Sequence, residues 1–211
     1  MRVEIITTGT ELLLGEIINT NFTWLAQELN QRGFDVLYQT TVGDNPARMK
    51  EVLDIAVKRA DIVITSGGLG PTRGDITKEI IAEYCNVDMY MNLEVWNHIH
   101  EMLSRRNICI AANNEKQALV PSGAIVLHNE AGTAPGLVLE HDKTTFVMLP
   151  GPPFELKTVC EKEFPDCTSP MIRPRRRRGF PMTSLGFPRQ FIMSGNVTSS
   201  SRLILIRLME E

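Results

Sequence analysis

Residues 61–77, DIVITSGGLGPTRGDIT, contain the pattern that most clearly predicts the fold. Residues 61–65 form a short, almost wholly apolar run, which is typical of a parallel strand that other elements cover on both faces. Four glycines then interrupt the chain, and apolar residues at helical spacing follow them: Ile76, Ile80, Ile81 and Tyr84. This order of buried strand, glycine loop and helix predicts one unit of an open, wound α/β sheet.

The same alternation continues on both sides of this stretch. Further strand-like runs are found at residues 3–8, 34–42, 120–121, 124–127, 136–139 and 144–148. Further helical patterns are found at residues 22–29, 46–57, 93–103 and 152–160. Strands that alternate with helices in this way predict a doubly wound sheet with helices on both faces.

Composition places the chain among globular proteins. It has 211 residues, of which 43% are hydrophobic and 22% charged, so it can form a sizeable core. No apolar run approaches the roughly 20 residues that span a bilayer, and the start shows neither a signal nor a transit peptide. The four cysteines lack CxxC spacing, which favours reduced thiols over disulfides or a zinc site. We therefore expect a cytoplasmic protein without a membrane partner.

Charge divides the chain into two parts. Residues 1–164 contain 14 Lys and Arg against 22 Asp and Glu, whereas residues 165–211 contain 8 Arg against 3 acidic residues. An acidic surface repels phosphate backbones, so no nucleic-acid partner is expected for the main part. We predict a domain over residues 1–163 and an irregular Arg-, Pro- and Ser-rich tail over residues 164–211. The tail is either a basic arm for nucleic acid or anionic surfaces or, as we favour, a truncated or frame-shifted end.

Wound sheets bind their ligands in the loops beyond the carboxyl ends of the strands. Four polar, glycine-bearing loops follow predicted strands: residues 8–15 with 19–21, residues 42–46, residues 65–77 and residues 149–153. In the third loop, glycines allow backbone N–H groups to converge on an anion, and Thr72, Arg73 and Thr77 add polar groups. The loop matches neither the P-loop nor GxGxxG. Phosphate binding and an ordinary turn, with Thr72 and Asp75 as a capping box, therefore both stay open.

Asp44 and Asp75 each lie where one of these loops enters a helix. Two carboxylates at neighbouring loop ends could hold a divalent ion that bridges phosphate oxygens. The alternative for each is a helix N-cap, which is a common role of aspartate at that position. Spacing alone favours the N-cap.

Taken together, the loops resemble the amino-terminal domain of the CinA (competence/damage-inducible) family. The segments that carry the resemblance are GTELLLG (9–15) with NTN (19–21), VGDN (42–45), GGLGPT (67–72), NEAGTAPG (129–136) and LPGPPFEL (149–156). The resemblance extends over residues 1–163. The family belongs to the wider molybdopterin-binding superfamily of MogA and MoaB type. The resemblance implies a three-layer α/β domain with a mostly parallel, doubly wound sheet.

The resemblance also implies a function. In the CinA branch it implies hydrolysis of the pyrophosphate bond of a nucleotide such as ADP-ribose, with Mg²⁺, Mn²⁺ or Co²⁺ as the metal. In the MogA branch it implies molybdopterin binding or adenylyl transfer to molybdopterin. A third interpretation is a non-catalytic module that binds a small-molecule nucleotide or pterin. A homo-oligomer is expected because the family generally forms one.

Carried over residue by residue, the resemblance makes Asp44 and Asp75 the metal-binding and catalytic carboxylates. It assigns substrate and phosphate binding to Thr10, Glu11, Asn19, Gly67, Gly68, Gly70, Thr72, Thr77, Gly132, Thr133 and Gly151. Gly74 departs from the family, because it stands where the family has the first of two adjacent acids. The smaller α/β subdomain that follows in the family is not visible after residue 163 either. Both departures support the binding-module interpretation.

Overall fold

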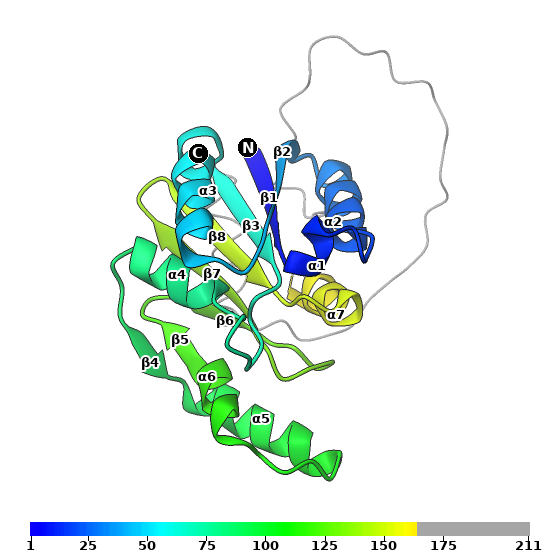
Figure 1. Cartoon of the computed structure of the whole chain (residues 1–211), viewed down its shortest axis with the longest axis vertical. Coiled ribbons are helices and arrows are strands. Elements are labelled where there is room, and N and C mark those ends of the chain that lie inside the picture. The colour runs from blue at the N-terminus through cyan, green and yellow to red at the C-terminus, as the bar shows by residue number, and fades with distance from the viewer. Residues whose placement is uncertain (164–211) are drawn as a thin grey trace, which may run out of the picture. The chain divides into compact units, whose positions relative to one another are not determined.

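A mixed six-stranded sheet forms the centre of the computed structural model, which describes residues 1–163 (Figure 1). The strands lie in the order β2-β1-β3-β8-β7-β6. Their bounds are β1 Arg2–Thr8, β2 Asp35–Val42, β3 Ile62–Ser66, β6 Ile125–Leu127, β7 Gly136–His141 and β8 Thr144–Leu149. Strands β2, β1, β3 and β8 pair in parallel, and β7 and β6 extend the sheet with antiparallel pairing. The two hypotheses about the tail concern residues outside the described part.

Helices cover both faces of the sheet, as the alternating pattern predicts (Figure 1). On one face α2 (Thr20–Gln31) contacts α7 (Pro153–Glu163), and on the other α3 (Pro46–Arg59) contacts α4 (Thr77–Tyr84). The predicted fold class, a three-layer, doubly wound α/β domain with a mostly parallel sheet, is confirmed. Within residues 1–163, no helix is both long and apolar enough to cross a bilayer.

The apolar run at residues 61–65 lies in the middle of the sheet. All five residues of β3 are buried, because β1 and β8 flank the strand and helices cover both faces of the sheet. The pattern predicted for α3 is also confirmed: Pro46 begins the helix, and Met49, Leu53 and Ala56 are buried in the core. The glycine loop after β3 therefore starts at a fixed point at the centre of the sheet edge.

A second, two-stranded sheet departs from the prediction. The strand predicted near residue 120, β5 (Leu119–Pro121), pairs antiparallel with β4 (Met89–Met91) and does not join the central sheet. These strands, α5 (Leu93–Arg105) and α6 (Glu115–Ala118) form an arm, residues 89–121, at the bottom of Figure 1. The pattern does not predict β4, α6, α1 (Thr10–Leu13) or η1 (Ala112–Asn114), because three or four residues carry too little periodicity.

Candidate functional site

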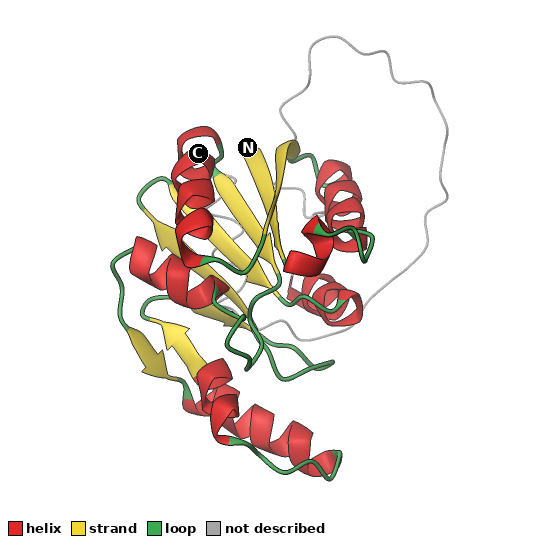
Figure 2. Ribbon diagram, in the orientation of Figure 1, coloured by secondary structure: helices red, strands yellow, loops and turns green. Residues whose placement is uncertain are grey.

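The four predicted loops meet at the carboxyl edge of the parallel strands (Figure 2). Gly9, which follows β1, donates its backbone N–H to the carbonyl of Val42 at the end of β2, at 3.1 Å. Gly67, which follows β3, donates its N–H to the carbonyl of Leu149 at the end of β8, at 3.0 Å. Because β1 and β3 are neighbours in the sheet, the two pairs of loops lie side by side.

Asn21, in the first turn of α2, fixes the fourth loop against the third. Its Nδ2 donates to the carbonyl of Gly151 at 2.7 Å and to Oγ of Ser66 at 2.9 Å. Gly151 packs closely on Gly67, since a Cβ at residue 151 would lie 3.4 Å from the Cα of Gly67. The Gly151 turn therefore borders the glycine loop, where the resemblance places the phosphate.

Gly67 and Gly68 leave no room for a side chain. Both have left-handed backbone angles, with φ of +104° and +71°. A Cβ on Gly67 would lie 2.6 Å from Oγ1 of Thr8, and a Cβ on Gly68 would overlap Oγ1 of Thr77. Thr77 begins α4 and donates its backbone N–H to the carbonyl of Gly68 at 3.1 Å. The glycine loop thus lies beside the amino end of α4, whose dipole favours an anion.

Asp44 is exposed beside the first loop and does not cap α3. The N-cap of α3 is Asn45, whose Oδ1 accepts the backbone N–H of Arg48 at 3.1 Å. Oδ2 of Asp44 instead accepts from the backbone N–H and the hydroxyl of Thr10, at 3.3 and 3.1 Å. The N-cap alternative for Asp44 at α3 is therefore wrong, and Thr10 orients this carboxylate.

Asp75 closes the third loop and does not cap α4. Its Oδ2 accepts from the backbone N–H of Thr72 at 2.9 Å and from the Thr72 hydroxyl at 2.5 Å. Gly70 packs against the same carboxylate, because a Cβ there would lie 2.7 Å from Oδ2. The helix begins only at Thr77, and its N-cap, Ile76, makes no side-chain hydrogen bond. One half of the predicted capping box is therefore present, because Asp75 accepts the N–H of Thr72, but the pair closes a turn and does not cap α4.

Gly74 lies where the two acidic loops face each other. A Cβ on Gly74 would lie 3.9 Å from both Cβ and Cγ of Asp44, and 3.8 Å from Oγ1 of Thr72, which binds Asp75. The hydrogen bonds that the described residues make to the two carboxylates all go to Oδ2. Oδ1 of each aspartate accepts none of these hydrogen bonds.

The donor set fits a divalent metal that is bound together with a phosphate ligand. Mg²⁺ prefers oxygen ligands and typically takes one or two carboxylates, several waters and the phosphates of a substrate. Asp44 and Asp75 supply two carboxylates. No group of three His, Cys, Asp or Glu side chains that could hold an ion is found in residues 1–163. Two carboxylates fit a metal only if water or a bound ligand supplies the remaining oxygens.

Glu11 and Asn19, two of the predicted ligand residues, make contacts within the protein. The Glu11 carboxylate lies against Gly9. Asn19 caps α2, since its Oδ1 accepts the N–H of Phe22 at 3.1 Å, and its Nδ2 donates to Oγ1 of Thr7 at 2.9 Å. Oδ1 of Asn19 thus caps α2 and its Nδ2 ties the helix to β1, and the role of Asn19 in ligand binding stays a prediction.

Gly132 and Thr133 lie in a loop that is shaped by the buried side chain of Asn129. Oδ1 of Asn129 accepts the N–H of Gly132 at 3.0 Å, and its Nδ2 donates to Oε2 of Glu155 at 2.7 Å. The Glu155 carboxylate occupies the space that a Cβ on Gly132 would need. The hydroxyl of Thr133 accepts from Nε2 of Gln117 at 3.0 Å. Side chains of α6 and α7 thus fix the position of this loop.

Sequence reasoning missed four polar residues that organise the site: Asn21, Lys116, Gln117 and Asn129. Hydrophobic periodicity does not report a polar side chain that is buried or bound to a loop. For Asn21 and Asn129 a signal was present, because both lie in segments that carry the family resemblance. For Lys116 and Gln117, the sequence carries no comparable signal.

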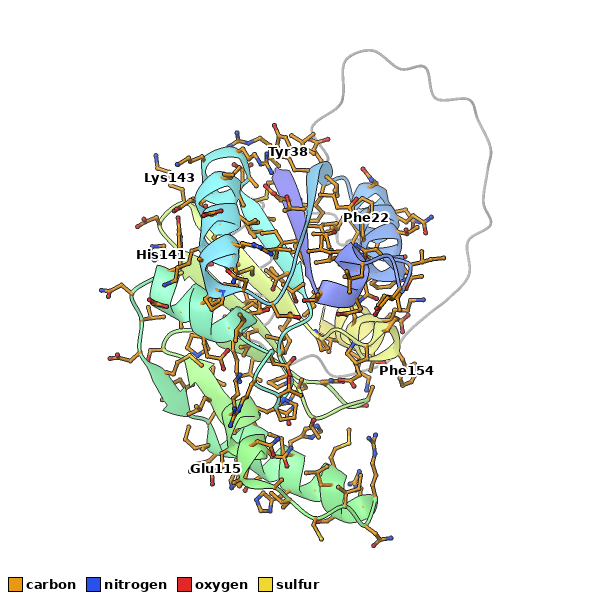
Figure 3. All side chains as sticks on the ribbon, viewed as in Figure 1. Phe22, Tyr38, Glu115, His141, Lys143 and Phe154 are labelled. Carbon is orange, nitrogen blue, oxygen red and sulfur yellow. The ribbon has the colours of Figure 1, made fainter. Side chains whose placement is uncertain are left out.

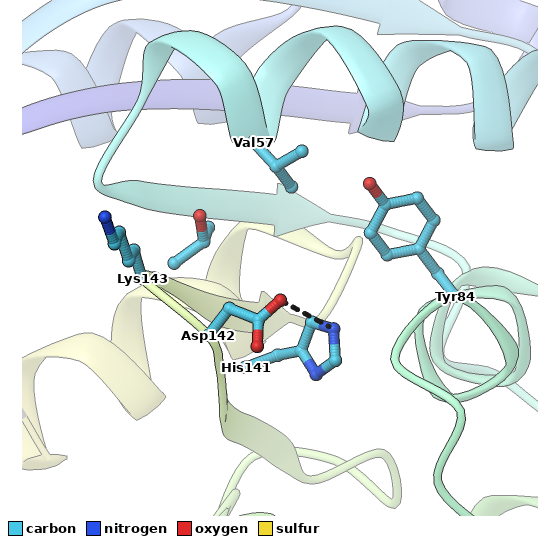
Figure 4. A pocket seen from close by; sticks show the side chains of 6 residues that line it. Val57, Tyr84, His141, Asp142 and Lys143 are labelled. Carbon is cyan, nitrogen blue, oxygen red and sulfur yellow. Dashed lines mark ion pairs between the residues drawn. The ribbon is translucent and has the colours of Figure 1, made fainter.

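A hollow of about 580 Å³ lies at the opposite end of the sheet (Figure 4). Val57, Tyr84, Thr144 and the turn 141–143 line it, and Thr144 is the first residue of β8, whereas the candidate site adjoins the last. Figure 3 shows His141 and Lys143 far from Phe154, which lies in the first turn of α7 after the Gly151 turn. The hollow contains none of the predicted ligand residues, so we do not assign the nucleotide or pterin to it.

Comparison with known proteins identifies the family. Residues 4–169 match the family model described as a probable molybdopterin binding domain. A relative from Caldicellulosiruptor bescii, whose name includes the words competence-damage inducible protein, is 50% identical over 163 residues, or 77% of this chain and 40% of the relative. A CinA-like protein of Dictyoglomus thermophilum is 46% identical over 161 residues, or 76% and 39% of the two chains. The chain thus spans about two fifths of the length of these curated relatives.

Solved structures share the fold. The protein CinA of Thermoplasma acidophilum, whose function is described as unknown, is 28% identical with a TM-score of 0.70, over 75% of this chain and 94% of that one. The molybdopterin biosynthesis enzyme MoaB of Thermus thermophilus is 22% identical with a TM-score of 0.52, over 76% of this chain and 87% of that one. At this identity the comparison shows a shared fold alone. The resemblance inferred from the sequence is therefore confirmed. The chain belongs to the family of the probable molybdopterin binding domain, and its domain is of the CinA type.

Proposed function

We propose that this domain hydrolyses the diphosphate bond of a nucleotide such as ADP-ribose, with a divalent metal held by Asp44 and Asp75. The observation that carries the proposal is the meeting of the two acidic loops at Gly74, beside the glycine loop and the amino end of α4. Neither aspartate caps the helix that follows it, so formation of α3 and α4 does not explain either residue. Membership of a molybdopterin-binding, CinA-type family supports a phosphate-bearing nucleotide or pterin as the ligand.

In this proposal the glycine loop binds the diphosphate and the aspartates hold the metal beside it. Gly67 and Gly68 allow the loop to pack tightly on Thr8 and on the amino end of α4, and the dipole of this helix end would stabilise the charge of a phosphate beside the loop. Thr10 and Thr72 orient Asp44 and Asp75 through Oδ2, which leaves Oδ1 for the metal. A bound divalent metal supplies positive charge and lowers the pKa of water. Water adds to one phosphorus and the bridging P–O bond breaks, which releases AMP and ribose 5-phosphate from ADP-ribose.

Incubation of the full chain with ADP-ribose tests this function. With Mg²⁺, Mn²⁺ or Co²⁺ we expect chromatography to show AMP and ribose 5-phosphate in equal amounts, and EDTA to stop their release. A folded protein that releases no AMP with any of the three metals would rule out the hydrolase.

The family description favours a second function, which is molybdopterin binding or adenylyl transfer to molybdopterin. Gly74 supports it, because the loop lacks the additional carboxylate that would strengthen a metal site. Saturable molybdopterin binding without AMP release from ADP-ribose would favour a binding module. Formation of adenylylated molybdopterin from ATP would favour transfer.

Gly74→Asp is expected to tighten Mn²⁺ binding by about tenfold, because affinity rises with the number of charged ligands. The substitution fits the space: no atom lies closer than 3.8 Å to the position of the new Cβ, and Asp44 is 3.9 Å away. Calorimetric titration with Mn²⁺ measures the change, and Gly74→Asn is the uncharged control of the same size. Equal Mn²⁺ affinities of wild type and Gly74→Asp would contradict a metal site at the meeting point of the two acidic loops.

A further inference from the structure

The short helix α6 sends the side chain of Lys116 to the third loop. Nζ of Lys116 donates to the carbonyl of Thr72 at 3.1 Å and to the carbonyl of Asp75, and it lies 3.7 Å from a carboxylate oxygen of Glu79. The side chain is 25% exposed. Hydrogen bonds from a charged donor are stronger than neutral ones. The ammonium group therefore holds two backbone carbonyls of the loop that carries Asp75.

The next residue, Gln117, contacts a different loop of the candidate site. Its side chain is buried, and its Nε2 donates to Oγ1 of Thr133 at 3.0 Å. Oε1 of Gln117 accepts from Nδ2 of Asn114 at 3.2 Å, so the orientation of the amide is fixed. Two consecutive residues of α6 thus reach the loop of Asp75 and the loop of Gly132 and Thr133.

Lys78, the second residue of α4, holds α6 in place. Lys78 is 2% exposed, and its Nζ donates to the carbonyls of Lys116, Gln117 and Leu119, at 2.6, 3.1 and 2.8 Å. Burial lowers the pKa of Lys78 to about 8, so the group is still mainly charged at pH 7. The same end of α4 contacts Gly68. The helix end beside the glycine loop therefore also sets the position of α6.

We propose that Lys116 is a positioning residue of the candidate site, which fixes the Asp75 loop opposite Asp44 while Gln117 fixes the Thr133 loop. This inference rests on the proposed function only for its catalytic consequence. The contacts of Lys116 are to main-chain carbonyls and to Glu79, so the charge of the side chain is already used within the protein. Its effect on a ligand would be exerted through the carboxylate of Asp75.

Loss of this ammonium group should loosen the loop. In Lys116→Met the carbonyls of Thr72 and Asp75 lose their charged donor, while the side chain keeps a similar length. A displacement of about 1 Å at a reacting group can cost a factor of about 100 in rate. We expect kcat for AMP release to fall by roughly 10- to 100-fold in Lys116→Met, with KM changed by less than about threefold.

Three variants and one activity-independent measurement test the inference. Lys116→Arg can donate to both carbonyls and should restore kcat to within about fivefold of wild type. Lys143→Met, an exposed lysine in the β7–β8 turn, is the matched control and should keep the wild-type kcat. Hydrogen exchange of the amides in residues 70–77 should be at least about tenfold faster in Lys116→Met than in wild type or Lys143→Met, in proteins with intact circular dichroism.

The outcomes separate this inference from the proposed function. Unchanged exchange in residues 70–77 of folded Lys116→Met would overturn the positioning role, whether or not the protein is a hydrolase. A raised KM with wild-type kcat would also overturn it, because it would indicate that Lys116 binds substrate directly. A third outcome is that the wild-type protein releases no AMP while the amides of residues 70–77 exchange faster than wild type in Lys116→Met and at the wild-type rate in Lys116→Arg. In that case the hydrolase proposal fails and the positioning role stands.

Discussion

Asp75→Asn is expected to lower kcat for AMP release from ADP-ribose by about 100-fold or more. The amide keeps the shape of the side chain and an oxygen that can accept from Thr72, so the loop should stay closed. The substitution removes one of the two negative charges beside Gly74, and metal affinity depends on the charge of the ligands. We expect the same loss for Asp44→Asn, whose side chain Thr10 would still orient. Initial rates at one fixed Mn²⁺ concentration near that which half-saturates wild type, and again at saturating Mn²⁺, in variants with wild-type circular dichroism and Tm, separate lost metal binding from a lower kcat.

Asp142→Asn is the matched control for both variants. Its side chain is 87% exposed, and its φ of +53° lies in the left-handed region, which asparagine adopts more readily than most residues. It lies in the turn before β8, at the end of the sheet opposite the candidate site. We expect kcat within about twofold of wild type, as for a surface change away from the site. If Asp44→Asn and Asp75→Asn hydrolyse ADP-ribose as fast as this control, the two carboxylates take no part in the reaction.

Gly68→Ala is expected to weaken the binding of ADP-ribose by at least about tenfold. The new methyl group would overlap Oγ1 of Thr77 and lie 3.0 Å from its Cβ. Thr77 begins α4 and binds the carbonyl of Gly68 at 3.1 Å, so the loop must move away from the helix end. A phosphate would then lose its close approach to the backbone. Calorimetric titration with the non-hydrolysable α,β-methylene analogue of ADP-ribose measures the loss.

Gly15→Ala is the control that distinguishes the clash with Thr77 from the loss of stability caused by an alanine in a left-handed backbone conformation. Gly15 has a φ of +72°, close to the +71° of Gly68, yet nothing lies within 4 Å of the position of its Cβ. Both variants should lose roughly 1–2 kcal/mol of stability from a left-handed alanine, but only Gly68→Ala displaces the glycine loop. Equal affinities of the two variants for the methylene analogue would contradict the role of Gly68 in phosphate binding.

Much of the central sheet is predictable from sequence, because its strands are apolar runs that end at glycine loops. β3 is the clearest case, since an apolar run of this kind needs cover on both faces and therefore lies in the middle of a sheet. The pairing of β4 with β5 is not predictable in the same way. Each strand has three residues, and their pairing depends on the path of α5 and α6 between them, which periodicity does not report.

The loops of the candidate site are predictable, whereas their side-chain contacts are not. Asp44 and Asn45 are adjacent and both residue types are good N-caps, so the sequence cannot distinguish which of them caps α3. Lys78 and Lys116 would be placed at the surface by the usual rule that lysine is rarely buried. Their partners are backbone carbonyls, which are the same in every residue. Only the folded chain shows that these lysines connect α4, α6 and the third loop.

Calorimetric titration of the full chain with the α,β-methylene analogue of ADP-ribose and, in parallel, with adenosine shows whether the glycine loop and the two acidic loops bind a diphosphate. In the presence of Mn²⁺ we predict that the analogue binds at least about 100-fold more tightly than adenosine, and that EDTA removes most of this difference. Equal affinities for the two ligands, or an affinity for the analogue that does not depend on Mn²⁺, would contradict the account.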